Sequence, residues 1–131
     1  MGSPDPPLFA AALERRERDG EPAAVIASAV AATWRDIEAA LTSIIGVQGV
    51  AALYKRSLAL ASRAHPCLLE PAATGSTVID LTALTAALGQ QTSNDAASAG
   101  GDFLQTFYGL VESLIGPSLT HRLLRKMTPT P

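Results

Sequence analysis

The sequence predicts an all-α protein, a compact bundle of four main helices with short terminal helices. The apolar fraction is 47%, and Ala and Leu dominate it. Both favour helices, because Ala loses no side-chain entropy in a helix and Leu loses little. Apolar residues also recur at spacings of three, four and seven, the period of an amphipathic helix. A length of 131 residues suits one domain.

The chain ends are predicted to be disordered around a single helical domain over residues 8–127. Residues 1–7 contain three prolines, and 128–131 read TPTP. A short helix is expected over 8–18, because the charge-dense tract ERRERDGEP ends in Gly and Pro.

The first main helix is predicted over about 22–45. Glu21 and Pro22 suit a first turn. An acidic side chain is stabilised at the positive end of the helix dipole, and the backbone N–H that proline lacks would have no partner within the helix at that position. Gly46 supplies a residue that can end the helix in a left-handed conformation. The apolar stripe consists of Val25, Ile26, Val30, Trp34, Ile37, Leu41, Ile44 and Ile45.

The second main helix is predicted over about 47–64, with Lys55 and Arg56 facing outward. Pro66 stops it, because the residue before a proline is disfavoured in helical geometry. The following stretch, HPCLLEPAATGST, is expected to form a loop or a broken turn.

The third and fourth main helices are predicted over about 80–90 and 96–115. Asp80 can cap the third, and the preceding TVI is too short to found a sheet. The polar run Ser93-Asn94-Asp95 offers starting residues for the fourth. Gly100-Gly101 implies either a closely crossing helix or a later helix start. Gly116-Pro117 then breaks the chain before a terminal helix over 118–127.

Two stretches repeat in outline at an offset of seventy residues: SIIGVQGVAALYKR (43–56) and SLIGPSLTHRLLRK (113–126). Each has a helix end, a Gly break and a second helix that carries a cationic pair. Two explanations stay open at this point. The repeat is either common helix-ending chemistry or a sign of two pseudo-twofold helical hairpins.

Charge and cysteine content exclude several classes of partner and site. The net charge is −2, which disfavours nucleic acid and anionic membranes as partners. The lone Cys67 allows no internal disulfide and suits a reducing compartment. We find no secretory signal, and Arg35, Asp36 and Glu38 interrupt the longest apolar stretch, so the prediction is a cytoplasmic protein.

No pattern of catalytic or metal-ligating residues appears, so we expect no enzyme, no metal site and no cofactor. His65 and His121 are the only histidines, and neither has a partner at zinc-ligand spacing. The pair His65 and Cys67 is a poor metal or nucleophile site, and a His65 that caps the preceding helix is favoured. His121 permits a histidine phosphotransfer-like alternative. However, the Lys and the following Gly of that motif are replaced by Leu124 and Arg125.

An interaction surface is predicted from exposed cations and one aromatic residue that lies off its helix stripe. Its members are Lys55, Arg56, Phe103, His121, Arg122, Arg125 and Lys126. Aromatic residues such as Trp34, Tyr54 and Phe107 are expected in the core. An alternative is that they hold a small apolar ligand or cofactor there, as in a sensor.

The segment GVAALYKRSLALASRAHP resembles stretches of small all-helical bacterial proteins that accompany two-component signalling systems. The similarity covers residues 34–68 and 107–125. It implies a regulatory or adaptor role and carries over no catalytic residue. The leading prediction is therefore a non-catalytic protein that binds another protein in bacterial signalling, with a homodimer as a further option.

Overall fold

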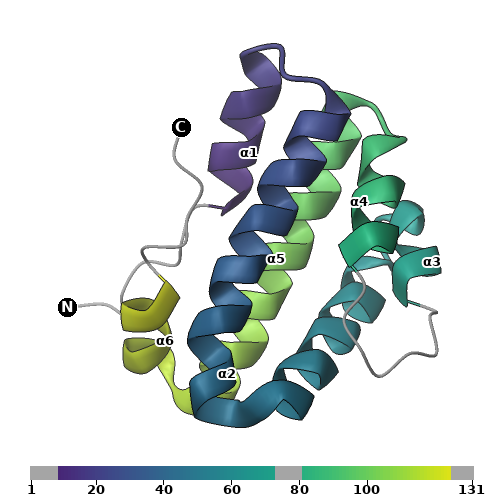
Figure 1. Cartoon of the computed structure of the whole chain (residues 1–131). Helices are drawn as coiled ribbons and strands as arrows, with labels where there is room; N and C mark the ends of the chain where they lie inside the picture. The colour runs from purple at the N-terminus through teal and green to yellow at the C-terminus, as the bar shows by residue number, and fades with distance from the viewer. Residues whose placement is uncertain (1–8, 73–80, 125–131) are drawn as a thin grey trace.

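A computed structural model describes residues 9–72 and 81–124 and confirms the all-α class, with no strand among these residues (Figure 1). The helices are α1 (Phe9–Arg18), α2 (Ala23–Ala61), α3 (Leu69–Ala72), α4 (Leu81–Gly89), α5 (Ser93–Ile115) and α6 (Pro117–Leu124), with a short 3-10 helix η1 (Pro66–Leu68). The predicted ends of the chain, and Asp80 with the preceding TVI, lie outside the described residues.

Helix α2 bends at Gly46 and consists of two arms. Gly46 has φ 83° and ψ 163°, a conformation open essentially to glycine alone. The first arm (23–45) and the second arm (47–61) correspond to two of the predicted helices, and Figure 1 shows the sharp turn between them. The second arm ends at Ala61, three residues earlier than expected, because residues 62–64 already form a turn.

Helix α5 lies at the centre of the molecule, where its most extensive contact is with α2 and its next with α1. Gly100 explains how closely these helices approach. A Cβ added there would lie 2.6 Å from Val30 Cγ2 of α2 and 3.5 Å from Leu13 Cδ1 of α1. Of the two explanations offered for Gly100-Gly101, the closely crossing helix is therefore confirmed. The other, a later helix start, is wrong, because α5 begins at Ser93, before the predicted start at residue 96.

Two local predictions differ from the structure. The start of α5 is capped by Thr92, whose hydroxyl accepts a hydrogen bond from the Asp95 N–H at 3.1 Å, so the cap lies before the predicted polar run. The stretch expected as a loop after the second arm contains η1 and α3, and Leu68 is fully buried there. Burial of this one leucine gives that segment a fixed place against the core.

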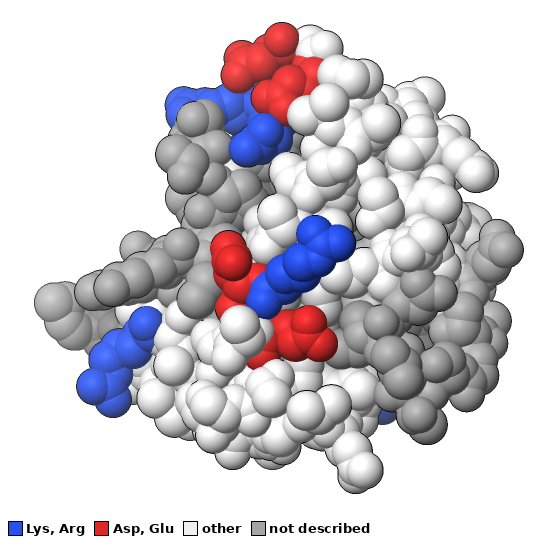
Figure 2. All heavy atoms as spheres, in the orientation of Figure 1, with Lys and Arg blue, Asp and Glu red and all other residues white. Residues whose placement is uncertain are grey.

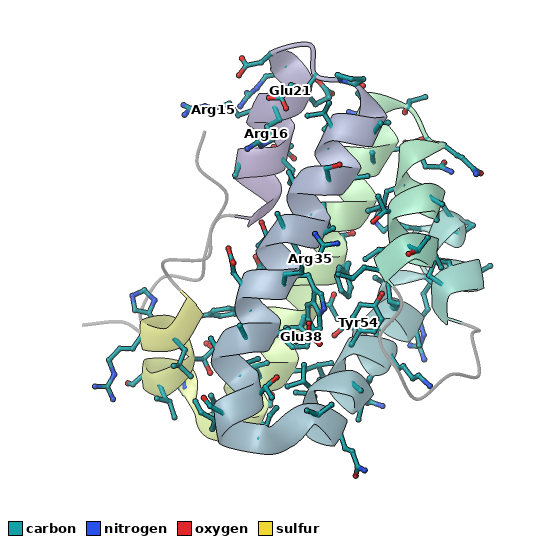
Figure 3. The ribbon with its side chains drawn as sticks, viewed as in Figure 1. Arg15, Arg16, Glu21, Arg35, Glu38 and Tyr54 are labelled. Atoms are coloured by element: carbon teal, nitrogen blue, oxygen red, sulfur yellow. The ribbon has the colours of Figure 1, made fainter. Side chains whose placement is uncertain are left out.

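The charge-dense tract between α1 and α2 has a structural role. Arg16 Nη1 lies 2.9 Å from Glu21 Oε1, and both side chains are about three-quarters buried (Figure 3). Ser93 Oγ donates to the Glu21 carbonyl at 3.0 Å, and Asn94 Nδ2 donates to Glu17 Oε1 at 3.0 Å. These contacts attach the α1–α2 connection to the beginning of α5.

One described helix, α2, is long and apolar enough to cross a membrane by length and composition alone. The charges at 35, 36 and 38 do not remove this candidate, because residues 39–54 carry no Asp, Glu, Lys or Arg. Core helices of water-soluble proteins meet the same criterion, and Gly46 bends α2 within this uncharged stretch. The cytoplasmic location stays a prediction.

Candidate functional site

The predicted interaction residues are distributed over different elements. Lys55 and Arg56 lie on the second arm of α2, with Lys55 half-buried and Arg56 exposed, while His121 and Arg122 lie on α6. In Figure 1, α6 and the second arm flank opposite sides of the first arm. The remaining predicted cations, at positions 125 and 126, lie outside the described residues.

Phe103 does not belong to a surface, which corrects the prediction. Its side chain is fully buried, and its ring lies 5.6 Å from the Tyr54 ring and 5.8 Å from the Trp34 ring, centroid to centroid. The sequence placed Phe103 off the α5 stripe, but α5 is covered on more than one side by α1, α2 and α4. A helix enclosed in this way buries residues outside a single stripe.

Trp34 is the centre of an aromatic cluster that fills the middle of the core. Its ring meets Phe107 edge to face at a centroid distance of 4.5 Å and Tyr54 at 4.9 Å, which are favourable aromatic geometries. Trp34 Nε1 and the Tyr108 hydroxyl are buried with no hydrogen-bond partner among the described residues. Burial, and then the Glu112 carboxylate, raise the pKa of Tyr108 above its ordinary value, so the hydroxyl stays protonated.

The backbone N–H of His65 donates to the Ala61 carbonyl at the end of the preceding helix at 3.0 Å, but the imidazole does not cap that helix and contacts α5 instead. Its Nε2 lies 2.5 Å from Asp102 Oδ2, and the His65 side chain is only 17% exposed. Burial, and then the charge of Asp95, raise the pKa of the half-buried Cys67 thiol above its ordinary value. A thiol of this kind is poorly suited to act as a nucleophile, because the thiolate is the reactive form.

The described residues contain no cluster of three or more His, Cys, Asp or Glu side chains placed to hold a metal ion. The contact between His65 and Asp102 joins only two such groups. Its role in the structure is to tie the turn after α2 to the middle of α5.

An open groove of about 640 Å³ lies between the first arm of α2 and helix α4. Its lining residues are Ala24, Ser28, Arg35, Leu81, Thr82, Thr85, Ala86, Gly89 and Gln90. A Cβ added to Gly89 would lie 3.8 Å from Ala24 Cα, so the helices nearly touch at that end. Among the described residues of the lining, Arg35 alone is charged, and it lies towards the other end of the α2 wall (Figure 3).

This groove has no counterpart among the features predicted from the sequence. Besides Leu81, the α4 wall contains Thr82, Thr85, Ala86 and Gly89, which share one helix face because they are spaced by three, four and seven. The opposite face of α4 buries Leu84 and Leu88. The sequence shows this small-residue face, but which helix lies beside it depends on the tertiary packing.

A second surface feature lies at the end of the molecule where the two helix-Gly-helix turns meet. We define the hinge cap as the exposed apolar side chains Ile44, Val47 and Leu114, which are 44%, 68% and 58% exposed. Gly116 has φ 91° and ψ 154°, almost the same conformation as Gly46. The bend of α2 and the turn from α5 to α6 both lie at the lower end of the molecule in Figure 1.

The offset-seventy repeat also matches in burial. Trp34, Ile37 and Leu41 of the first arm are fully buried, and so are their counterparts Leu104, Phe107 and Val111 on α5. The next pair, Ile44 and Leu114, is exposed on both sides. The sequence assigned Ile44 to the core stripe of its helix, and the structure places both Ile44 and Leu114 beyond the edge of the core.

Comparison with known proteins gives no relative: no protein-family model, no curated protein and no solved structure matches this chain. The groove and the hinge cap are therefore the features of this chain that bear on its function.

Proposed function

We propose that this chain is a non-catalytic, protein-binding regulatory or adaptor protein whose partner inserts a helical segment into the groove between α2 and α4. The observation that carries the proposal is the groove itself, an open depression between two helices whose described lining consists mainly of small residues and includes one arginine. Helix-in-groove binding is a common mode of peptide recognition.

The shape of the groove favours a helix over a compact small molecule. Ala24 and Gly89 nearly touch at one end, and the walls contain Ser28, Thr85 and Ala86, whose short side chains let a third backbone come close. Close helix contact through small residues increases the dispersion contacts between backbones. A partner helix would continue the packing that α2 and α4 begin.

Arg35 gives the proposed partner its chemical character. It is exposed and lies near Glu38 and Tyr54, where the two arms of α2 face each other (Figure 3). A carboxylate on the partner helix can form a charge-assisted hydrogen bond with the guanidinium. We therefore expect the bound segment to be amphipathic, with small apolar residues and at least one Asp or Glu.

The proposal can be tested with a photoreactive residue incorporated at Ala86, which is exposed in the groove, and at Ala52, which is exposed on the second arm. Crosslinking in the native cell extract should give one defined adduct from position 86 and none from 52. Excess unlabelled chain should compete, and Arg35→Glu should weaken competition about tenfold, equivalent to about 1.4 kcal/mol. Equal adducts from both positions, or undiminished competition by Arg35→Glu, would exclude groove binding.

Two alternative functions stay predictions. One is a sensor that holds a small apolar ligand or cofactor in the core. Trp34 Nε1 and the Tyr108 hydroxyl, which have no hydrogen-bond partner among the described residues, would be available to a cofactor there, whereas the packing of the aromatic rings against one another favours an ordinary interior. Native mass spectrometry of the purified chain would detect a retained molecule. The other is phosphotransfer through His121. It predicts that a phosphorylated donor protein transfers an acid-labile phosphoryl label to this chain, and that the His121→Ala variant does not take up the label.

The matched turns at Gly46 and Gly116 support a finer description of the fold, in which two helical hairpins are related by approximate twofold symmetry within a four-helix bundle. The shared burial pattern of the two halves supports the same arrangement. Under this proposal the two turns form similar surfaces, side by side.

A further inference from the structure

We propose that the contact between His65 and Asp102 is a pH-sensitive latch, which holds the segment after α2 against α5 in mildly acidic solution and loosens as the pH rises. We define this segment, residues 62–72 with the turn, η1 and α3, as the strap. His65 Nε2 lies 2.5 Å from Asp102 Oδ2, although the two residues are 37 positions apart in the sequence. Neither residue belongs to the described lining of the groove, so the latch does not depend on the proposed partner.

The latch lies next to the point where the strap enters the core. The Leu68 N–H donates to the His65 carbonyl at 2.9 Å, and the His65 N–H donates to the Ala61 carbonyl at 3.0 Å. Leu68 is fully buried, whereas the Cys67 side chain beside it is half-buried. The imidazole adds a side-chain contact with α5 to this backbone framework. Loss of that contact removes one attachment of the strap and makes its local opening more frequent.

The charged groups that α5 presents to the strap are acidic. Asp102 contacts the His65 imidazole directly, and the charge of Asp95 acts on Cys67 of the strap. Helix α4, on which η1 packs, has no charged residue over Leu81–Gly89. In Figure 2 the surface over α4 is accordingly free of blue and red. From the elements packed against the strap, carboxylates are therefore the charges near the imidazole.

The neighbours of His65 along the chain carry both signs of charge. Within the strap, Arg63 is exposed, and Glu70 belongs to the sequence of α3. Lys55 and Arg56 lie on the second arm of α2, about two to three helical turns before the histidine. The carboxylate that touches the imidazole is thus the charge that most affects it, because Coulomb attraction falls with distance.

Protonation strengthens the latch because it adds a charge to the donor. Imidazole is the side chain that changes charge between about pH 5 and 8, a range in which an ordinary carboxylate stays ionised. When both partners are charged, Coulomb attraction adds to the hydrogen bond. The Asp102 side chain is 55% exposed, so water stays in contact with the pair and the charged form is not fully desolvated. The closed strap is therefore favoured in the acidic part of this range, and this contribution is lost as the pH rises through it.

Cys67 reports on opening of the strap, because it is the only cysteine of the chain and lies in η1. The test measures how fast a dipyridyl disulfide reacts with the full chain and with a synthetic peptide of residues 64–70, from about pH 5.5 to 7.5. Both thiols are mostly protonated in this range, so their thiolate fractions rise in parallel. A change in the ratio of the two rates then measures a change in access to the thiol. The ratio should rise roughly three- to tenfold from the acidic to the neutral end.

Three variants assign the pH dependence to the latch. Asp102→Asn removes the carboxylate charge and should give a raised ratio that no longer changes with pH. His65→Gln should have the same effect, and Asp102→Asn, at the more exposed position, keeps the test available if His65→Gln does not fold. Asp95→Asn is the matched control, because it removes a carboxylate about two helical turns earlier on α5. Its ratio should keep the wild-type pH dependence.

The core should stay closed while the strap opens. Trp34 is fully buried, so its fluorescence and the helical circular dichroism should not change over the same pH range. A wild-type ratio that is constant with pH would overturn the proposal, as would wild-type pH dependence in Asp102→Asn. Loss of the pH dependence in Asp95→Asn would also overturn it, since the general charge of α5 would then be the cause. Trp34 fluorescence that changes together with the thiol rate would show that the whole core opens and that no separate strap exists.

Discussion

Glycine has two different roles in the described part of this molecule, and the sequence indicated only one of them. Gly46 and Gly116 were recognised as helix ends, and both adopt positive φ values that other residues rarely reach. Gly100 has a different role, because it admits the Val30 side chain where α5 meets α2. Sequence alone does not distinguish a turn glycine from a packing glycine inside a helix.

Gly46→Ala should destabilise the protein by about 1 to 3 kcal/mol, because alanine at φ 83° and ψ 163° is strained. No atom lies within 4 Å of the added Cβ, so the effect would come from the backbone and not from a clash. Urea unfolding followed by circular dichroism measures the change.

Gly109→Ala is the matched control for this change. Gly109 is exposed within α5, and its added Cβ also has no atom within 4 Å. Its φ is not positive. Alanine should therefore stabilise the helix by roughly 0.5 to 1 kcal/mol. Equal destabilisation by both variants would contradict the role given to Gly46.

Helix positions follow from the sequence more closely than helix ends do. The apolar period predicted the two arms of α2, α4 and α5 to within a few residues, because burying one face requires that period. The start of α5 was placed too late, since Thr92 and three polar residues after it are all good caps. Which of them takes extended geometry depends on the contact between Ser93 and Glu21.

Thr92→Ala should cost about 1 kcal/mol, because the Asp95 N–H at the start of α5 loses its acceptor. Ser98→Ala is the control on the same helix, where Ser98 is exposed within the second turn and alanine has the better helix propensity. Thermal unfolding should show a lower midpoint for Thr92→Ala and an unchanged or higher one for Ser98→Ala. A lower midpoint for both would indicate that the cap is not the cause.

The described part of the molecule is organised around α5, which contacts α1, α2, α4 and α6. The first arm of α2 and α1 cover its start, and the aromatic cluster around Trp34 fills its middle. His65 binds Asp102 from the far end of the second arm, so elements distant in sequence meet on one helix. This arrangement predicts a single cooperative folding unit.

Trp34, the only tryptophan, reports on that cooperativity because its ring is fully buried. In urea, the loss of its blue-shifted fluorescence should coincide with the loss of helical circular dichroism, as expected for a two-state domain. Two separated transitions would show that the helices around α5 unfold independently.

The sequence alone determined the helical class, the main helix positions and the glycine turns, because these depend on local propensity and on the apolar period. Tertiary structure decided which faces are covered. Phe103 is enclosed although it lies off the stripe, and Ile44 and Leu114 continue their stripes but are exposed, because the core ends before them. The groove and the hinge cap depend on where α2, α4, α5 and α6 meet, and the period along one helix carries no information about its neighbours.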